Sequence, residues 1–375
     1  MNRHASASVP ESQSAPLRWR EAATGTECTL HQLSPYIGKL KSSIAGDLIA
    51  QFSKIGELIV DPFCGAGTVP LEAVLRGRRA FGADVSPYAR VLSSAKLHPP
   101  ISMERALAKA ARLHKESGEL PQPDLRTVPQ WVRRFFHQET LREALRLAAI
   151  CRRPGNEFYF ACLLGILHHQ RPGFLSYPSS HLVPYLRSKK FPRERFPELY
   201  EYRPVLPRLL AKVRRSFRRS PANAKWSAAF RECAVENLRF PSCFDALITS
   251  PPYMNALDYQ RDNRLRLWFI DPRLVDSSMD EATRTREAFV SAIESVATKA
   301  EYGLRNSGHC VFVVGEQSKR KFEAHPAQSV IDTMSQHAPS LRLQQVIADY
   351  IPDVRRTRRE CRGVKREMIL VFKRR

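Results

Sequence analysis

Residues 58–68 read LIVDPFCGAGT, and this stretch decides the fold class of the chain. Its apolar start predicts a buried strand that ends at Asp61. Gly65 and Gly67 then predict a tight loop, and residues 68–75 predict the helix that follows it. Strand, glycine loop and helix is the geometry in which a backbone approaches a ligand closely. The loop has only two glycines, so it lacks the GxGxxG spacing of a dinucleotide-binding loop.

A second strand is predicted at residues 79–84, which read RAFGAD and end in an acidic residue. In α/β folds that bind nucleosides, a carboxylate about 20 residues beyond the glycine loop accepts hydrogen bonds from ribose hydroxyls. The sequence therefore predicts Asp84 as a ribose ligand.

Residues 249–253 read TSPPY and follow the apolar run 244–248, a predicted buried parallel strand. Ligands of open α/β sheets bind beyond the carboxyl ends of strands. The hydroxyl of Ser250 and the carbonyl of Pro251 can both accept from an exocyclic amino group, and Pro252 stiffens the turn. Tyr253 offers a ring on which a nucleobase can stack. This arrangement suits methyl transfer to the amino group of a base.

The three segments together resemble a known family. Residues 249–253 resemble catalytic motif IV of amino-methylating nucleic-acid methyltransferases in its Ser-Pro-Pro-Tyr form, and residues 58–68 resemble motif I of S-adenosylmethionine-dependent methyltransferases. Residues 31–40 (HQLSPYIGKL), with the amphipathic helix predicted after them, resemble motif X. Over residues 31–98 and 230–375 the chain thus resembles prokaryotic site-specific DNA amino-methyltransferases. The resemblance implies an α/β, Rossmann-like fold with an inserted helical domain and S-adenosylmethionine as cofactor.

The resemblance also implies roles for individual residues. Asp61 would hold the amino group of the methyl donor, the two glycines would let the chain pass close to its methionine moiety, and Phe63 would pack at its edge. The implied donor-binding residues are Tyr36, Lys39, Asp61, Phe63, Gly65, Gly67, Thr68, Asp84 and Ser86, and the implied catalytic residues are Ser250, Pro251, Pro252 and Tyr253. The family's acidic motif III is altered, because Cys233 stands where relatives carry Asp. In relatives this motif contacts the edge of the donor's adenine, and in this chain Glu232 or the backbone would have to make that contact.

The order of motifs X, I, long insert and IV resembles the α arrangement, in which the insert recognises the target. A base must leave the duplex to reach the donor, and neither a metal nor a covalent intermediate is expected. Ser250 in place of Asp or Asn resembles the N4-cytosine subgroup. N6-adenine in DNA and a base amino group in RNA remain alternatives. A non-catalytic nucleic-acid-binding protein is a further one, which the intact Asp61 and Asp84 disfavour.

Composition points to a polyanionic partner. Lys and Arg number 60 against 37 Asp and Glu, the net charge is +23 and the pI is about 10.1. Basic residues alternate with aromatic residues in the segment 99–225, which suits phosphate contacts and base stacking. The predicted nucleic-acid-binding residues are Arg133, Arg134, Arg171, Lys189, Lys190, Arg214 and Arg215, joined by Arg355, Arg356, Arg358 and Arg359 of a loop between the last two strands.

The predicted organisation has three parts. Residues 1–27 form a flexible tail, residues 28–98 and 226–375 form the catalytic domain, and residues 99–225 form a helical insert that is too long for an ordinary connection. Eight cysteines without a CxxC pair and an absence of long apolar runs predict a cytoplasmic, nucleoid-associated protein. Its expected partners are double-stranded DNA with a specific site and a cognate restriction endonuclease, without a membrane or a metal.

Overall fold

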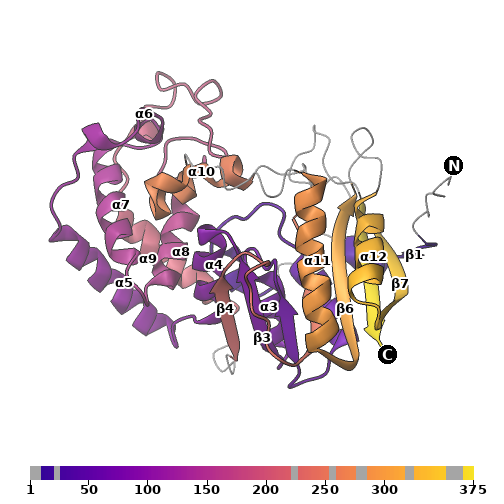
Figure 1. Cartoon of the computed structure of the whole chain (residues 1–375). Coiled ribbons are helices and arrows are strands. Elements are labelled where there is room, and N and C mark those ends of the chain that lie inside the picture. Colours follow the sequence, from indigo (N-terminus) through magenta and orange to yellow (C-terminus); the bar gives the residue numbers. More distant parts are fainter. Residues whose placement is uncertain are drawn as a thin grey trace.

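The computed structural model describes residues 10–20, 26–220, 227–252, 259–275, 285–316, 325–351 and 366–375. Within these residues one sheet runs through the molecule in the order β1-β7-β8-β6-β5-β2-β3-β4 (Figure 1). Its strands are β1 (Gln13–Ser14), β2 (Leu58–Asp61), β3 (Arg79–Asp84), β4 (Ala228–Glu232), β5 (Phe244–Thr249), β6 (Leu304–Glu316), β7 (Leu341–Tyr350) and β8 (Arg366–Arg374).

The order of the strands places the ligand-binding edge. Strands β4, β3, β2, β5 and β6 are mutually parallel, whereas β8 runs antiparallel to both β6 and β7. The chain moves outward from β2 to β3 and β4, and then returns to the other side of β2 with β5. This reversal makes the boundary between β2 and β5 a topological switch point, where α/β sheets bind ligands. The strands predicted at residues 58–61, 79–84 and 244–248 are confirmed as β2, β3 and β5.

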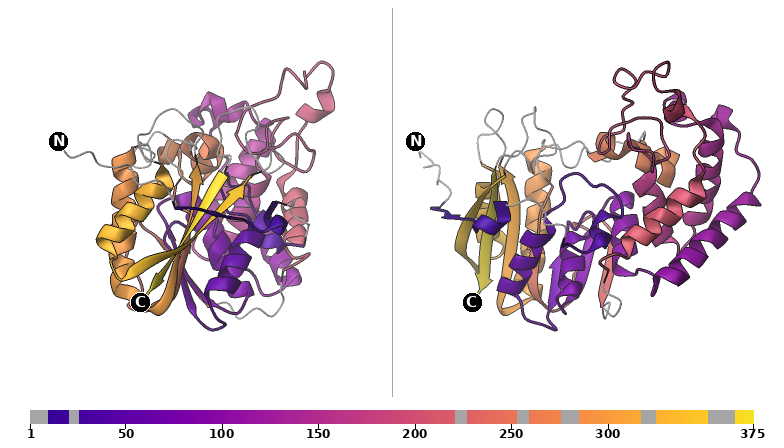
Figure 2. Two further views of the ribbon diagram at one scale, coloured as in Figure 1. Left: turned by 90° about the vertical axis from the view of Figure 1, so that its right-hand side faces the viewer. Right: turned by 180° about the vertical axis from the view of Figure 1, so that it is seen from behind.

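Helices cover both faces of the sheet (Figure 2). Alternate side chains of a strand point to opposite faces, so Ile59 packs with helices α2 (Ser42–Phe52) and α3 (Thr68–Leu75). Its neighbour Val60 packs in the cluster of α11 (Arg286–Gly303) and α12 (Pro326–His337). Strands buried on both faces read as continuous apolar runs, which is why residues 58–60 and 244–248 could be recognised in the sequence.

The insert lies beside the β4 end of the sheet, on the left of Figure 1. It follows α4 (Pro87–Leu97) and contains α5 (Met103–Gly118), α6 (Gln130–Arg133), α7 (Gln138–Cys151), α8 (Glu157–Ile166) and α9 (Val205–Ser216), with 3₁₀ turns at Leu125–Thr127 and Pro197–Tyr200. One hydrophobic cluster joins these helices to Tyr88 and Leu92 of α4 and to Phe269 of α10 (Tyr259–Ile270). The insert therefore shares its core with the catalytic part of the chain.

The N-terminal segment departs from the predicted loose tail. Gln13–Ser14 extend the sheet as β1 beside β7, and helix α1 (Leu17–Arg20) follows. The ring of Trp19 is buried, and its Nε1 donates to Asp47 Oδ2 over 2.6 Å. The Ser- and Pro-rich composition suggested a tail, but burial of one large aromatic side chain contributes enough to order a short segment. Of residues 1–27, the structure describes 10–20 and 26–27.

Candidate active site

The loop between β2 and α3 has the backbone that its glycines predict. Gly65 has φ +48° and Gly67 has φ +70°, both in the left-handed region. A Cβ at Gly67 would lie 2.7 Å from Ser93 Oγ, so a side chain would also clash with α4. Ser93 Oγ donates to Gly65 O over 3.0 Å, and the buried Lys96 donates to Ala66 O. Helix α4 therefore holds this loop in place from behind.

Asp61 ends β2 inside the molecule. Its side chain is 3% exposed, and Oδ1 accepts from Thr249 Oγ1 at 2.6 Å and from Phe63 N at 3.3 Å. Burial raises the pKa of Asp61 to about 7 despite these bonds, and the nearby Asp84 raises it further. A cationic group bound beside Asp61 would favour its charged carboxylate form. A sulfonium donor with an ammonium group supplies such a cationic group.

Asp84 ends β3 on the neighbouring strand. Its Oδ2 accepts from Gly65 N and its Oδ1 from Ser86 N, each over 2.9 Å. Burial raises the pKa of this carboxyl group as well. Each carboxylate oxygen has two lone pairs, so these bonds fix the side chain and leave acceptor capacity for hydroxyl groups of a ligand. The position agrees with the predicted ribose contact.

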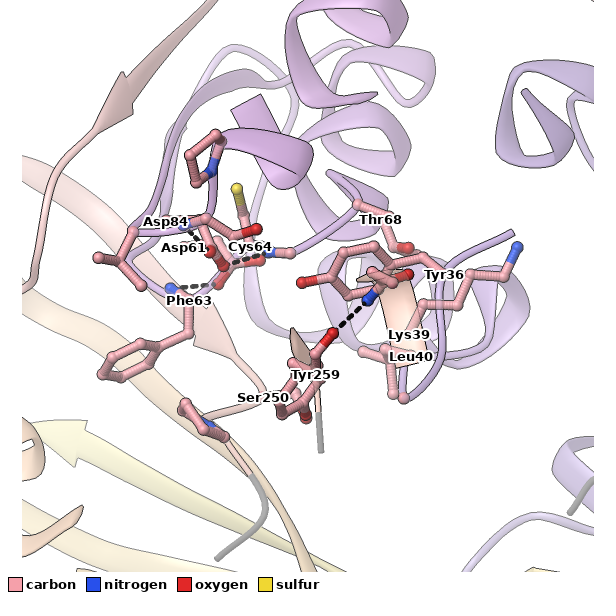
Figure 3. Close-up of a pocket in the computed structure, with 18 of the residues that line it drawn as sticks. Tyr36, Lys39, Leu40, Asp61, Phe63, Cys64, Thr68, Asp84, Ser250 and Tyr259 are labelled. Atoms are coloured by element: carbon pink, nitrogen blue, oxygen red, sulfur yellow. Dashed lines mark hydrogen bonds between the residues drawn. The ribbon is translucent and has the colours of Figure 1, made fainter. Parts of the chain in front are cut away.

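One cavity with an empty volume of about 1060 Å³ brings these residues together, and we call it the donor cavity. In Figure 3 Asp61, Phe63 and Asp84 lie on one side of it, Tyr36, Lys39 and Leu40 on the other, and Ser250 and Tyr259 below. The predicted donor-binding residues that line it are Tyr36, Lys39, Asp61, Phe63, Gly65, Thr68, Asp84 and Ser86. Gly67 does not line the donor cavity, because it serves as the left-handed cap of α3.

The polar atoms of the donor cavity fit S-adenosylmethionine. Thr68 Oγ1, at the first residue of α3, is buried and has no hydrogen-bond partner among the described residues. Asn263 Oδ1 on α10 is also buried and has no hydrogen-bond partner among the described residues. Thr68 and Asn263 both line the donor cavity. A buried polar atom costs free energy unless a ligand or water satisfies it. The N-terminus of α3 favours a negatively charged group, and the methionine moiety of the donor carries a carboxylate.

The predicted catalytic turn reaches the donor cavity in part. Ser250 and Pro252 line it, whereas Pro251 is buried and does not. Ser250 Oγ donates to Val313 O over 3.1 Å, and a hydroxyl whose proton is engaged acts as an acceptor toward other groups. Tyr253 lies outside the described residues.

The helix α10 supplies cavity residues that the sequence did not single out. Tyr259, Gln260, Asn263 and Leu267 line the donor cavity, and Tyr259 lies 6.4 Å from the ring of Tyr36. A search for polar residues on the first helix after the SPPY turn would have found Asn263.

The two residues of the altered motif III, Glu232 and Cys233, lie at the end of β4 and outside the donor cavity. Glu232 ends β4, and its Oε2 pairs with Arg90 Nε at 2.7 Å. Neither Glu232 nor Cys233 lines the donor cavity. The backbone of Cys233 instead donates to Asp84 O over 3.0 Å, which ties the end of β4 to the end of β3.

The predicted nucleic-acid-binding side chains that the structure describes are all exposed, and they are Arg133, Arg134, Arg171, Lys189, Lys190, Arg214 and Arg215. The first two lie on or next to α6, which is at the same upper end of the molecule as α10 in Figure 1. Lys190 Nζ lies 5.6 Å from the ring centre of Phe191, so basic and aromatic groups do alternate on this surface. Arg355, Arg356, Arg358 and Arg359 lie outside the described residues.

Comparisons with known proteins point to one enzyme class. Residues 35–114 match the model of the RMKL-like methyltransferase domain family UPF0020. A type II methyltransferase, M.MjaII of Methanocaldococcus jannaschii, is 29% identical over 68 residues, which are 18% of this chain and 13% of that protein. The chain therefore matches only a small part of the length of this curated relative.

Solved structures give weak overall likenesses. The rRNA methyltransferase aviRa of Streptomyces viridochromogenes has a TM-score of 0.36 and 13% identity, covering 94% of this chain and 93% of its own. Geranyl diphosphate C-methyltransferase of Streptomyces coelicolor A3(2) has a TM-score of 0.38 and 9% identity. The match covers 90% of this chain and 77% of that enzyme. Because these scores are below 0.5, the fold assignment depends on the sheet order and the loop geometry described above.

The fold is that of S-adenosylmethionine-dependent methyltransferases, the donor cavity suits this cofactor, and residues 35–114 are similar to a methyltransferase domain. The matched residues 35–114 include Tyr36, Lys39, the whole β2–α3 loop and Asp84. No helix among the described residues is long and apolar enough to cross a membrane. In the same part of the chain, no group of three His, Cys, Asp or Glu side chains is arranged to hold a metal ion.

Proposed function

We propose that this methyltransferase transfers the methyl group of S-adenosylmethionine to the exocyclic amino group of a nucleic-acid base, with cytosine N4 in a specific DNA sequence as its acceptor. The observation that carries the proposal is the position of Ser250. It follows β5, the strand next to β2, and lines the same cavity as Asp61 and Asp84. The acceptor residue and the donor residues thus share one site.

The chain's own groups would perform the reaction by positioning. Ser250 Oγ, with its proton engaged by Val313 O, would accept a hydrogen bond from the base amino group. This bond would aim the nitrogen lone pair at the donor's methyl group. As the N–CH₃ bond forms, the amino nitrogen becomes cationic and then loses one proton. S-adenosylmethionine supplies the electrophilic methyl group and leaves as the neutral thioether.

The electrostatics of the cavity support this assignment of groups. The carboxyl groups of the buried Asp61 and the half-buried Asp84 line the cavity, and a positively charged donor would be stabilised there before transfer. Charge is relieved when the sulfonium becomes a thioether, so the reaction needs neither a metal nor a covalent intermediate.

The substrate half of the proposal rests on the insert and on charge. We propose that residues 99–225 form the target-recognition region, because basic side chains are exposed along this segment and its helix α6 lies at the end of the molecule that holds α10 (Figure 1). The net charge of +23 suits a polyanion. Duplex DNA is the proposed partner, with a cognate restriction endonuclease as a second one in the cell. A base would be extruded from the duplex to reach Ser250.

Two substrates of the same chemistry compete with cytosine in DNA. Adenine N6 presents the same exocyclic amino group, and Ser before Pro-Pro-Tyr is the only residue that favours cytosine N4. Structured RNA would also fit the positive charge of the chain and the residues of the candidate site.

The test is a transfer assay with labelled S-adenosylmethionine, bacterial DNA and bacterial RNA in separate reactions. We expect label in DNA. Label in RNA alone would mean that the substrate is RNA. Donor binding without label in either polymer would refute nucleic-acid methylation.

A further inference from the structure

A second cavity adjoins the donor cavity and has the opposite charge. Its empty volume is about 1030 Å³, and we call it the cationic cavity. Its lining contains Lys39, Arg171, Lys212 and Arg215, and no Asp or Glu appears among its described lining residues. The remaining lining residues are Thr29, His31, Gln32, Ser34, Pro35, Tyr36, Gly165, Phe174, His181, Leu182 and Ser216.

Lys212 is the deepest of the four cations. Its side chain is 8% exposed, and its Nζ donates to Gln32 O over 2.6 Å. An ammonium group has three donors, and no carboxylate forms an ion pair with Lys212 in the described part of the chain. Burial lowers the pKa of Lys212 to about 8, and an anion in the cavity would restore its preference for the charged form. A buried cation without a counter-charge indicates an anionic guest.

The carboxylates closest in sequence to the wall are engaged by neutral residues of that wall and by residues outside it. Glu27 accepts from Gln32 Nε2 and Ser42 Oγ, and Glu72 accepts from His31 Nε2 and pairs with Arg76. Neither Glu27 nor Glu72 lines the cavity.

His31 adds a buried ring nitrogen that has no hydrogen-bond partner among the described residues. The residue is 1% exposed, and its Nδ1 has no hydrogen-bond partner among the described residues. Since Nε2 donates to Glu72 Oε1 at 2.6 Å, Nδ1 remains an acceptor. It would therefore face a hydroxyl group or a water that accompanies an anion, while the lysine and arginine side chains face its charged oxygens.

The walls of the cationic cavity are built from two parts of the chain. Residues 29–39 come from the catalytic part, and the rest come from α8, α9 and the segment that contains 171–182. A Cβ at Gly165 would lie 2.0 Å from Leu33 O, so α8 packs directly on the first of these segments. Thr29 Oγ1 donates to Ser216 O over 2.7 Å and joins the same segment to α9. The cavity is therefore a fixed feature of the interface between insert and catalytic part.

We infer that the cationic cavity holds one backbone phosphate of the nucleic-acid substrate. This inference rests on the proposed function, because it assigns the cavity to the same substrate. Lysine and arginine side chains without internal counter-charges are what a phosphodiester requires. Tyr36 and Lys39 line both cavities, so a phosphate held here is beside the donor. The insert would thus contact the substrate at the cavity wall as well as on its exposed surface.

The first experiment titrates inorganic phosphate into the full-length chain and measures binding calorimetrically. Wild type is compared with Lys212→Met, which keeps the length of the side chain and removes the charge. Lys109→Met is the matched control, because Lys109 also donates to a backbone carbonyl of the insert, Gly155 O, and does not line the cavity. Arg171→Gln at the exposed rim serves as a second variant if Lys212→Met lowers the melting temperature.

The second experiment measures affinity for a random-sequence DNA duplex and for RNA at several salt concentrations. Each phosphate contact contributes about 0.9 to the slope of log affinity against log salt for duplex DNA. We expect Lys212→Met to bind phosphate at least about tenfold more weakly and to reduce this slope by about 0.9, with Lys109→Met unchanged in both.

Two results would overturn the inference. Equal phosphate binding by wild type and Lys212→Met would exclude the cavity as an anion site. Loss of phosphate binding with an unchanged salt slope for DNA and RNA would make it a site for a small free anion. Failure of the proposed function is distinguishable, because wild type would then bind the donor and label neither polymer, whatever the phosphate titration gives.

Discussion

The donor cavity and the cationic cavity share Tyr36 and Lys39, yet their charges differ. The donor cavity contains the carboxyl groups of the buried Asp61 and the half-buried Asp84, whereas the described lining of the cationic cavity contains lysine and arginine without an acidic residue. A sulfonium donor is cationic and a nucleic acid is anionic, so each cavity is complementary to one reactant of the proposed function. Under that proposal, residues 34–39 would separate the two ligands, and the opposite charges of the cavities would keep each ligand in its own site.

The largest expected effect comes from Asp84→Ala. This change removes the proposed ribose ligand and the acceptor that fixes Gly65 N. We expect the affinity for S-adenosylmethionine to fall about 100-fold or more, equivalent to about 2.8 kcal/mol, in equilibrium dialysis. Glu232→Gln is the control, because Glu232 ends the next strand and does not line the cavity. Donor affinity within twofold of wild type for Asp84→Ala would show that the donor binds elsewhere.

Ser250→Ala should affect the reaction and spare the donor. Loss of one acceptor for the base amino group should lower the rate of methyl transfer roughly 10- to 100-fold, because one lost hydrogen bond costs about 1–3 kcal/mol. Donor affinity should change by no more than about twofold, since Asp61 and Asp84 keep their contacts. Single-turnover kinetics and dialysis separate the two quantities. A parallel loss of both would indicate structural damage to the β5 turn.

The pH dependence of donor binding tests Asp61. Its pKa is raised to about 7 in the free protein, so donor affinity should increase by up to about tenfold per pH unit from pH 5 to 7 and level off above. An acid with a raised pKa stabilises the folded state below its unfolded pKa, and this contribution is lost as pH rises through 7. Asp61→Asn should flatten the binding profile. A profile of unchanged slope in this variant would assign the titration to another group.

The smallest expected effect belongs to the exposed surface. The double change Lys189→Gln and Lys190→Gln removes two exposed charges of the insert. Nucleic-acid affinity should fall a few-fold at physiological salt, and the salt slope for duplex DNA should decrease by about 1.8 if each contacts one phosphate. Donor affinity should stay the same. An unaltered salt slope would mean that these lysines face solvent only.

The donor cavity could be predicted from the sequence because its residues are local. Asp61, Gly65 and Asp84 lie in one strand–loop–strand segment, where a hydrophobic run and glycine spacing fix their geometry. The same holds for Ser250, which follows a fully buried strand.

The cationic cavity could not be predicted in this way. Lys212 lies in a run of basic residues on α9, and nothing in that run distinguishes a buried lysine from the exposed Arg214 two positions further on. Its environment is set by residues 29–36, which are about 180 positions away and are placed there by tertiary packing. Trp19 shows the same limit, because composition suggested a tail where packing orders the segment.

The most direct test of the central claim identifies the methylated nucleoside. Wild type and Ser250→Ala are incubated with labelled S-adenosylmethionine and bacterial DNA or RNA, and the products are digested and separated. We expect N4-methylcytosine from DNA with wild type and a strongly reduced yield with Ser250→Ala. Donor binding by wild type without a methylated amino group on any base of either polymer would contradict the proposed function.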